Sequence, residues 1–109
     1  MFLARIDDAP ENNWVHSMIP AADQSNNNTA VWRWLGGNDL VTVSDWRWDD
    51  GQAFWSGGNN GSPVNGAYTN WSPTEPTNPS NKCLAMQASV GTWYNLDCTV
   101  ARPYVCEQY

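Results

Sequence analysis

Apolar residues near the start of this chain form two groups, which predict a strand followed by a helix. Residues Leu3 to Ile6 read as a short strand. Asp8 then stands at the position of a helix N-cap, and Glu11 completes a pattern similar to a capping box. The large apolar residues that follow recur at helical spacing: Trp14, Val15, Met18 and Ile19. We therefore predict a helix from about Ala9 to Ile19, followed by the helix-ending Pro20.

Tryptophans at alternate positions indicate strands in the middle of the chain. Residues 31–35 and 46–48 each carry two of them, so each pair lies on one face of a predicted strand. Paired aromatic rings on strands usually pack in a core. Residues 52–81 are mostly Gly, Asn, Ser, Pro and Thr, and their few aromatic residues favour an ordered loop fixed to the body. The remaining strand candidates are residues 82–88, 92–95 and 103–107, with a tight turn at 89–91.

Length and charge restrict the class of protein. The 109 residues suffice for one domain with a single modest core. The net charge of −6 argues against nucleic acid or anionic membranes as partners. No apolar run approaches the roughly 20 residues that cross a bilayer, so we expect no membrane insertion. Met1 to Arg5 lack the apolar stretch of a signal peptide, so the targeting segment of a secreted protein would lie outside this sequence.

The three cysteines leave one over. Cys83 and Cys98 can close a loop of about 15 residues, which is worth roughly 3 kcal/mol in the chain-entropy model. Cys106 then has no partner within the chain, which suggests that its partner is missing or lies on another chain. The alternative is three free thiols in a cytosolic protein, and the motifs around the cysteines weigh against it.

Several motifs follow one another in the order seen in a known family. They are Leu3 to Ile6 with Glu11-Asn12, Trp34 to Asp39, Trp46 to Gly51, Tyr68 to Trp71 with Glu75-Pro76, and Cys83, Cys98 and Cys106. Over essentially the whole chain they resemble the C-type lectin-like domain family. This resemblance implies an α+β fold with small antiparallel sheets, one helix retained in this chain, and a long ordered loop region that carries the ligand site.

The resemblance also implies that part of the family's domain is missing. Residues 1–109 would form a single C-type lectin-like domain that lacks the family's first strand and first helix. That helix bears the fourth family cysteine, so Cys83 would pair with Cys98 and Cys106 would stay unpaired. The last strand would lose its usual neighbour and expose an edge. We therefore expect a less stable domain with a tendency to self-associate through this edge or through Cys106.

Sugar-binding members of the family hold a Ca²⁺ ion at the long loop. They use a Glu-Pro-Asn tripeptide, a Glu before the third-strand cysteine, and an adjacent Asn and Asp. In this chain Glu75 is kept, whereas the Asn of the tripeptide corresponds to Thr77 and the second Glu to Asn81. The Asn-Asp pair corresponds to Tyr94 and Asn95. One carboxylate among amides cannot neutralise a divalent ion, so we expect a degraded calcium site.

Weak Ca²⁺ binding would fall to Glu75, Asn81 and Asn95, and we assign no other cofactor. At the family's auxiliary calcium position Asp39 is kept, while the usual Glu corresponds to Val43. The same loop supplies the expected ligand-binding residues, which are Glu75, Thr77, Asn78, Asn81, Tyr94, Asn95 and Trp55. Among these, Trp55 and Tyr94 are expected to offer ring faces on which a sugar can stack.

We expect a non-catalytic ligand-recognition module in an extracellular or cell-surface setting. Carbohydrate is the favoured ligand because Glu75-Pro76 and the loop aromatics persist. The alternative is a calcium-independent module on the same fold that binds protein or another surface. An enzyme is disfavoured because the chain has a single His and no plausible base beside a Ser or Cys.

Overall fold

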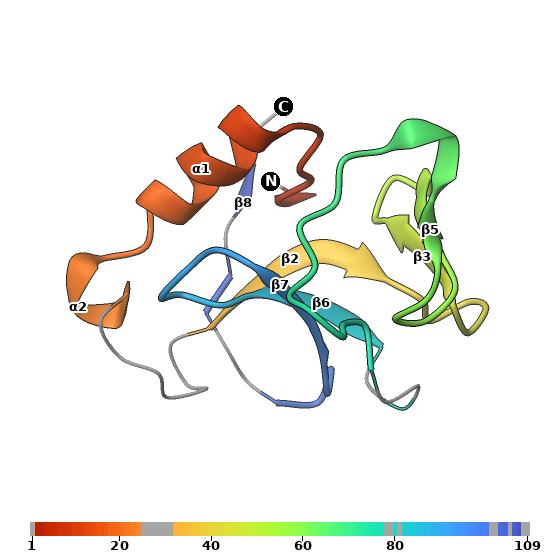
Figure 1. Cartoon of the computed structure of the whole chain (residues 1–109). Coiled ribbons are helices and arrows are strands. Elements are labelled where there is room, and N and C mark those ends of the chain that lie inside the picture. The colour runs from red at the N-terminus through yellow and green to blue at the C-terminus, as the bar shows by residue number, and fades with distance from the viewer. Residues whose placement is uncertain are drawn as a thin grey trace.

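The strands of this chain form two antiparallel sheets (Figure 1). The computed structural model describes residues 2–24, 32–77, 80, 82–100, 103–104 and 106–107. The larger has six strands in the order β5-β4-β3-β2-β6-β7, and the smaller pairs β1 with β8. The helices are α1 (Ala9–Ser17), the four-residue α2 (Ala21–Gln24) and the 3-10 turn η2 (Val64–Gly66). The strands are β1 (Phe2–Leu3), β2 (Arg33–Asn38), β3 (Asp45–Trp48), β4 (Ala53–Ser56), β5 (Ser62–Pro63), β6 (Cys83–Met86), β7 (Trp93–Leu96) and β8 (Cys106–Glu107).

Helix α1 begins where the sequence predicts. The Asp8 side chain accepts a hydrogen bond from the Glu11 backbone N–H at 2.8 Å, which satisfies one of the free donors of the first turn. The Glu11 carboxylate reaches back to the Asp7 N–H. The helix ends two residues before the predicted Ile19, and of its predicted apolar stripe only Val15 and Ile19 are buried. Trp14 and Met18 face solvent, so the apolar face is narrower than the pattern indicates.

The core is built largely from aromatic rings on the six-stranded sheet. Trp46 and Trp48 are buried as predicted, and Trp48 stacks on Phe54 with ring centroids 4.3 Å apart. Strand β2 continues three residues beyond the predicted end at residue 35 and includes Gly36 and Gly37. A Cβ at Gly37 would lie 2.8 Å from Leu84 Cδ2 and 3.0 Å from Phe54 Cζ, so the ring and the aliphatic chain occupy that space.

A buried polar contact joins helix α1 to the sheet. Asn12, which is 4% exposed, accepts a hydrogen bond from Trp93 Nε1 at 2.8 Å. Its amide nitrogen donates to the Gly91 carbonyl at 3.2 Å, and Asn70 donates to the same carbonyl at 2.9 Å. The predicted disulfide is confirmed, since Cys83 on β6 is bonded to Cys98 just beyond β7, with a Cα–Cα distance of 5.3 Å. Strand β7 is therefore fixed at both ends.

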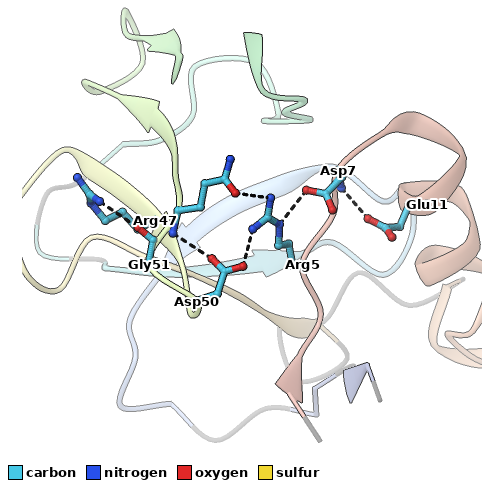
Figure 2. Close-up of polar contacts among 7 residues, drawn as sticks. Arg5, Asp7, Glu11, Arg47, Asp50 and Gly51 are labelled. Carbon is cyan, nitrogen blue, oxygen red and sulfur yellow. Dashed lines mark hydrogen bonds and ion pairs between the residues drawn. The ribbon is translucent and has the colours of Figure 1, made fainter. Parts of the chain in front are cut away.

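Arg5 connects the N-terminal segment to the turn between β3 and β4 (Figure 2). Its guanidinium donates to Asp7 at 2.8 Å, to Gln52 at 2.9 Å and to Asp50. The same turn is closed by Arg47, which donates to the Gly51 carbonyl at 2.9 Å. These contacts lie on the surface and hold the loops of the sheet's β3–β4 end.

Two predictions about the elements are wrong. Residues 53–56 and 62–63 form strands β4 and β5 within the stretch that reads as loop, because aromatic side chains of β4 are buried in the core. The last strand is not left unpaired, because Phe2 lies opposite Glu107 and Leu3 opposite Cys106 in an antiparallel pair. Figure 1 shows the N-terminus beside β8. That the domain lacks the family's first strand and helix stays a prediction.

Candidate functional site

The loop that carries Glu75 is attached to strand β7 by backbone hydrogen bonds. Trp93 N donates to the Asn70 carbonyl at 2.8 Å, and Ser72 N donates to the Trp93 carbonyl at 2.9 Å. The Ser72 hydroxyl also donates to Tyr94 Oη at 2.9 Å. The segment preceding Glu75 therefore runs along β7, which brings the predicted loop residues next to the predicted strand residues.

Glu75, Thr77 and Asn95 meet in one hydrogen-bonded group, the Thr77 cluster. Thr77 N donates to Asn95 Oδ1 at 2.8 Å and to Glu75 Oε2 at 3.1 Å. The Thr77 hydroxyl lies 3.1 Å from the same Glu75 oxygen and 3.4 Å from Asn95 Oδ1. In return, Asn95 Nδ2 donates to the Thr77 carbonyl at 3.2 Å. Three of the predicted site residues are thus brought together.

Burial and hydrogen bonding act on Glu75 in opposite directions. Partial burial raises the pKa of the Glu75 carboxyl, because the charged form loses hydration. The hydrogen bonds from Thr77 favour the charged form and offset part of this effect. The site therefore contains a half-buried carboxyl whose ionised form is stabilised by hydrogen bonds from the neutral Thr77.

A hollow of about 400 Å³ lies beside the Thr77 cluster. Thr77 and Asn95 line one side, and Asp39, Ser44 and Gly58 are among the residues that line the rest. Asp39 is only 3% exposed, and its Oδ2 accepts a hydrogen bond from Ser44 N at 2.9 Å. Its Oδ1 is buried and has no hydrogen-bond partner among the described residues. Buried carboxylate oxygens without a partner are rare, so Asp39 is an unusual residue in the lining of this hollow.

Charged oxygens are scarce among the described residues at the two expected calcium positions. Within the described ranges, no three His, Cys, Asp or Glu side chains gather closely enough to hold a metal. At the primary position Glu75 is the one carboxylate, and the oxygens of Glu75 and Asn95 already accept hydrogen bonds from Thr77. At the auxiliary position Asp39 is accompanied by Val43, which is exposed. Calcium sites need six to eight oxygens, several of them charged.

The two predicted stacking residues differ in their surroundings. Tyr94 is half-buried, and its ring packs edge-on against Trp32 with centroids 4.6 Å apart. The expectation that Trp55 offers an open ring face is wrong, because Trp55 is only 9% exposed. Its ring packs against Trp71 at 6.1 Å, and its Nε1 donates to the Gly58 carbonyl at 3.1 Å. Trp55 therefore shapes the loop that borders the hollow.

Three further predicted residues fall outside what the structure describes. Asn78 and Asn81 are outside the described residues, so their ligand and metal roles stay predictions. The backbone of Cys106 lies in β8, but its side chain is also outside the description, and its unpaired state stays a prediction.

The loop from β2 to β3 adds two features that the motif comparison did not assign to the site. Ser44, whose φ of 70° lies in the left-handed region, presents its N–H to Asp39. Leu40, Val41 and Val43 are exposed on the same loop, and Val41 is 93% exposed. A run of apolar residues at loop positions gives no periodic signal, so only the Asp39 match pointed toward this part of the chain.

Comparisons with known proteins agree with this geometry. Residues 2–108 match the model of the family described as "Lectin C-type domain". Human C-type mannose receptor 2 is 39% identical over 77 residues, which cover 69% of this chain and 4% of that protein. The galactose-specific lectin nattectin of Thalassophryne nattereri is 28% identical over 106 residues, covering 95% of this chain and 57% of that protein. The chain thus spans less than two thirds of the length of either relative.

A solved structure shares the fold as well. The crystal structure of a calcium-independent type II antifreeze protein superposes with a TM-score of 0.66 at 25% identity, covering 94% of this chain and 63% of that one. The two chains therefore share one fold. The chain belongs to the C-type lectin domain family, whose fold is a non-catalytic recognition module.

Proposed function

We propose that this chain is an extracellular recognition module that binds carbohydrate at the loop around the Thr77 cluster, with a calcium site too degraded to hold the ion firmly. The observation that carries the proposal is the meeting of Glu75, Thr77 and Asn95 beside a hollow bordered by Asp39. Nattectin, which is named as galactose-specific, and a mannose receptor are among the relatives, which supports sugar as the ligand class.

The hollow offers the chemistry that a polyhydroxylated ligand needs. Asp39 lines this hollow, and a sugar hydroxyl is a suitable donor to an aspartate carboxylate. Gly58 also lines the hollow, and a Cβ placed there would meet no heavy atom within 4 Å. Asn78, Asn81 and Tyr94 would extend this surface, and Glu75, Asn81 and Asn95 would account for any weak Ca²⁺ binding.

A glycan array read with calcium and with EDTA tests the proposal. We expect the wild-type domain to bind a defined set of sugars under both conditions. Asp39→Asn removes a charged acceptor and should weaken binding about tenfold. Asp7→Asn, the same change at an exposed carboxylate on the Arg5 side, should leave binding unaltered. Binding that EDTA abolishes would contradict the degraded calcium site, and binding to no glycan at all would contradict the carbohydrate assignment.

The second candidate function is a calcium-independent module that binds protein or another surface. The exposed apolar loop of Leu40, Val41 and Val43 favours it, because contiguous apolar exposure often marks an interaction site. The fold of a calcium-independent antifreeze protein is a further example of this architecture. If this candidate is correct, the wild-type domain should bind no glycan, and Val41→Ser should abolish binding to the partner.

The names of the relatives also bear on where the protein acts. Their names include a receptor and a lectin, which supports an extracellular or cell-surface location for this chain. Among the described residues, no helix has both the length and the apolar character needed to cross a bilayer. Self-association through Cys106 belongs to this proposal and is tested by sedimentation with and without reductant.

A further inference from the structure

Thr77 joins the loop that carries Glu75 to strand β7 through two backbone groups. Its N–H and carbonyl both bond to the side chain of Asn95, at 2.8 and 3.2 Å. Asn95 is 2% exposed and lies within strand β7, so it is a fixed partner rather than a mobile surface amide. The Thr77 hydroxyl and N–H also lie 3.1 Å from Glu75 Oε2, which closes the turn before it.

These contacts use the oxygen atoms that a cation at this position would need. Calcium could reach Asn95 Oδ1 or Glu75 Oε2 only in competition with the donors of Thr77. A single carboxylate provides too little charge to offset that loss, and the described residues offer no cluster of acids nearby. The residues present therefore disagree with a metal-held loop.

We propose that the Thr77 cluster takes the place of a loop cation in this chain, so that the loop keeps its shape and recognises its ligand without calcium. Thr77 and Asn95 are then positioning residues. The inference deepens the proposed function and rests on it only for the location of the ligand. The independence of the loop's order from calcium follows from the hydrogen bonds themselves.

The rest of the loop is attached in the same metal-free way. Ser72 N donates to the Trp93 carbonyl at 2.9 Å, and its hydroxyl donates to Tyr94 Oη at 2.9 Å. The segment from Ser72 to Thr77 is thus bonded to three consecutive residues of β7 (93–95). A loop held at both of its ends by direct hydrogen bonds has no need of an ion between them.

Hydrogen exchange of the purified domain in EDTA and in 5 mM CaCl₂ tests the inference, because that concentration is about fivefold above the weak end of extracellular calcium modules. The amides from Ser72 to Thr77 should show equal protection under both conditions. Thr77→Val removes the hydroxyl donor and should speed their exchange about fivefold. The matched control is Thr99→Val, because Thr99 bonds to Asp97 two residues earlier at 2.8 and 2.9 Å, as Thr77 bonds to Glu75. Thr99→Val should leave the loop unaltered.

A second variant should create the calcium dependence that the wild type lacks. Asn95→Asp keeps an acceptor for Thr77 N but replaces the amide donor with an oxygen facing the Thr77 carbonyl. It also places a second carboxylate beside Glu75. We expect its loop to exchange faster than wild type in EDTA and to regain protection in calcium.

Two results would overturn the inference. One is wild-type loop protection that falls in EDTA, and the other is Thr77→Val exchange equal to that of Thr99→Val. Failure of the proposed function looks different. A calcium-insensitive loop in a domain that binds no glycan would support the role of Thr77 and contradict only the ligand class.

Discussion

Replacing the buried Asn12 should destabilise the domain strongly. Asn12→Ala removes the acceptor of Trp93 Nε1, a bond of 2.8 Å at a tryptophan that is fully buried. The Gly91 carbonyl keeps its bond from Asn70, so the cost comes mainly from the stranded indole N–H and the space left by the amide. A buried donor without a partner costs about 1–3 kcal/mol, and the lost packing adds to it.

We expect the free energy of unfolding to fall by about 2 to 3 kcal/mol, which corresponds to a decrease in Tm of roughly 10 to 20 °C in a domain of this size. Urea melts followed by the fluorescence of the eight tryptophans measure it directly. Since β7 also carries Tyr94 and Asn95, ligand binding should weaken along with stability.

Asn13→Ala is the matched control, because Asn13 is the next residue on the same helix and is exposed. Its effect should stay within about 0.5 kcal/mol. If the two variants unfold at the same urea concentration, the contact between α1 and β7 does not stabilise the fold, and the reasoning from buried donors is refuted.

Three further predictions concern the rest of the fold. Replacing Cys83 and Cys98 together with Ser should lower the free energy of unfolding by about 3 kcal/mol, and reductant should bring wild type to the same value in urea melts. Burial raises the pKa of Glu75 above its ordinary value of 4.5, so ionisation of this carboxyl disfavours the folded state. The free energy of unfolding should therefore decrease as the pH rises from the ordinary pKa through the raised one. Glu75→Gln should remove that part of the pH dependence of Tm, and an unchanged profile would contradict it. Gly37→Ala should cost about 1–3 kcal/mol, because a Cβ there would meet Leu84, whereas Gly58→Ala, in open space, should be tolerated in thermal melts.

Local patterns predicted the elements whose signals are themselves local. The cap at Asp8 and the start of α1 depend on residues within one turn, and both are confirmed. The pairing of Cys83 with Cys98, which the family resemblance implies, is confirmed as well, and it joins the paired strands β6 and β7. The family resemblance added the order of the motifs and hence the fold.

The parts that were missed depend on contacts between distant residues. Strand β4 has only four residues in a stretch rich in Gly and Asn, and its core packing rather than its composition explains it. In the sequence, Trp55 lies in a stretch that reads as loop, which favours an exposed ring. In the structure its ring packs against Trp71 and is buried. The bond between Asn12 and Trp93 joins residues 81 positions apart, and no periodicity in the sequence signals such a pair.

Sequence matching predicted that the three residues of the Thr77 cluster lie together, but it did not predict the hydrogen bonds between them. Matching Glu75, Thr77 and Asn95 to the family's calcium ligands placed them together, as the structure also does. The exchange of Asn for Thr at position 77 reads in the sequence as the loss of a ligand. In the structure it is also a gain, because the hydroxyl of Thr77 bonds to the remaining acceptors on Glu75 and Asn95.

Calorimetric titration of the purified domain with Ca²⁺ tests the central claim most directly, since it measures the ion against a site with one carboxylate. We expect no saturable heat up to calcium concentrations of about 1 mM, the weak end of known protein sites. Saturable binding of one ion in the micromolar range, lost in Glu75→Gln, would contradict it.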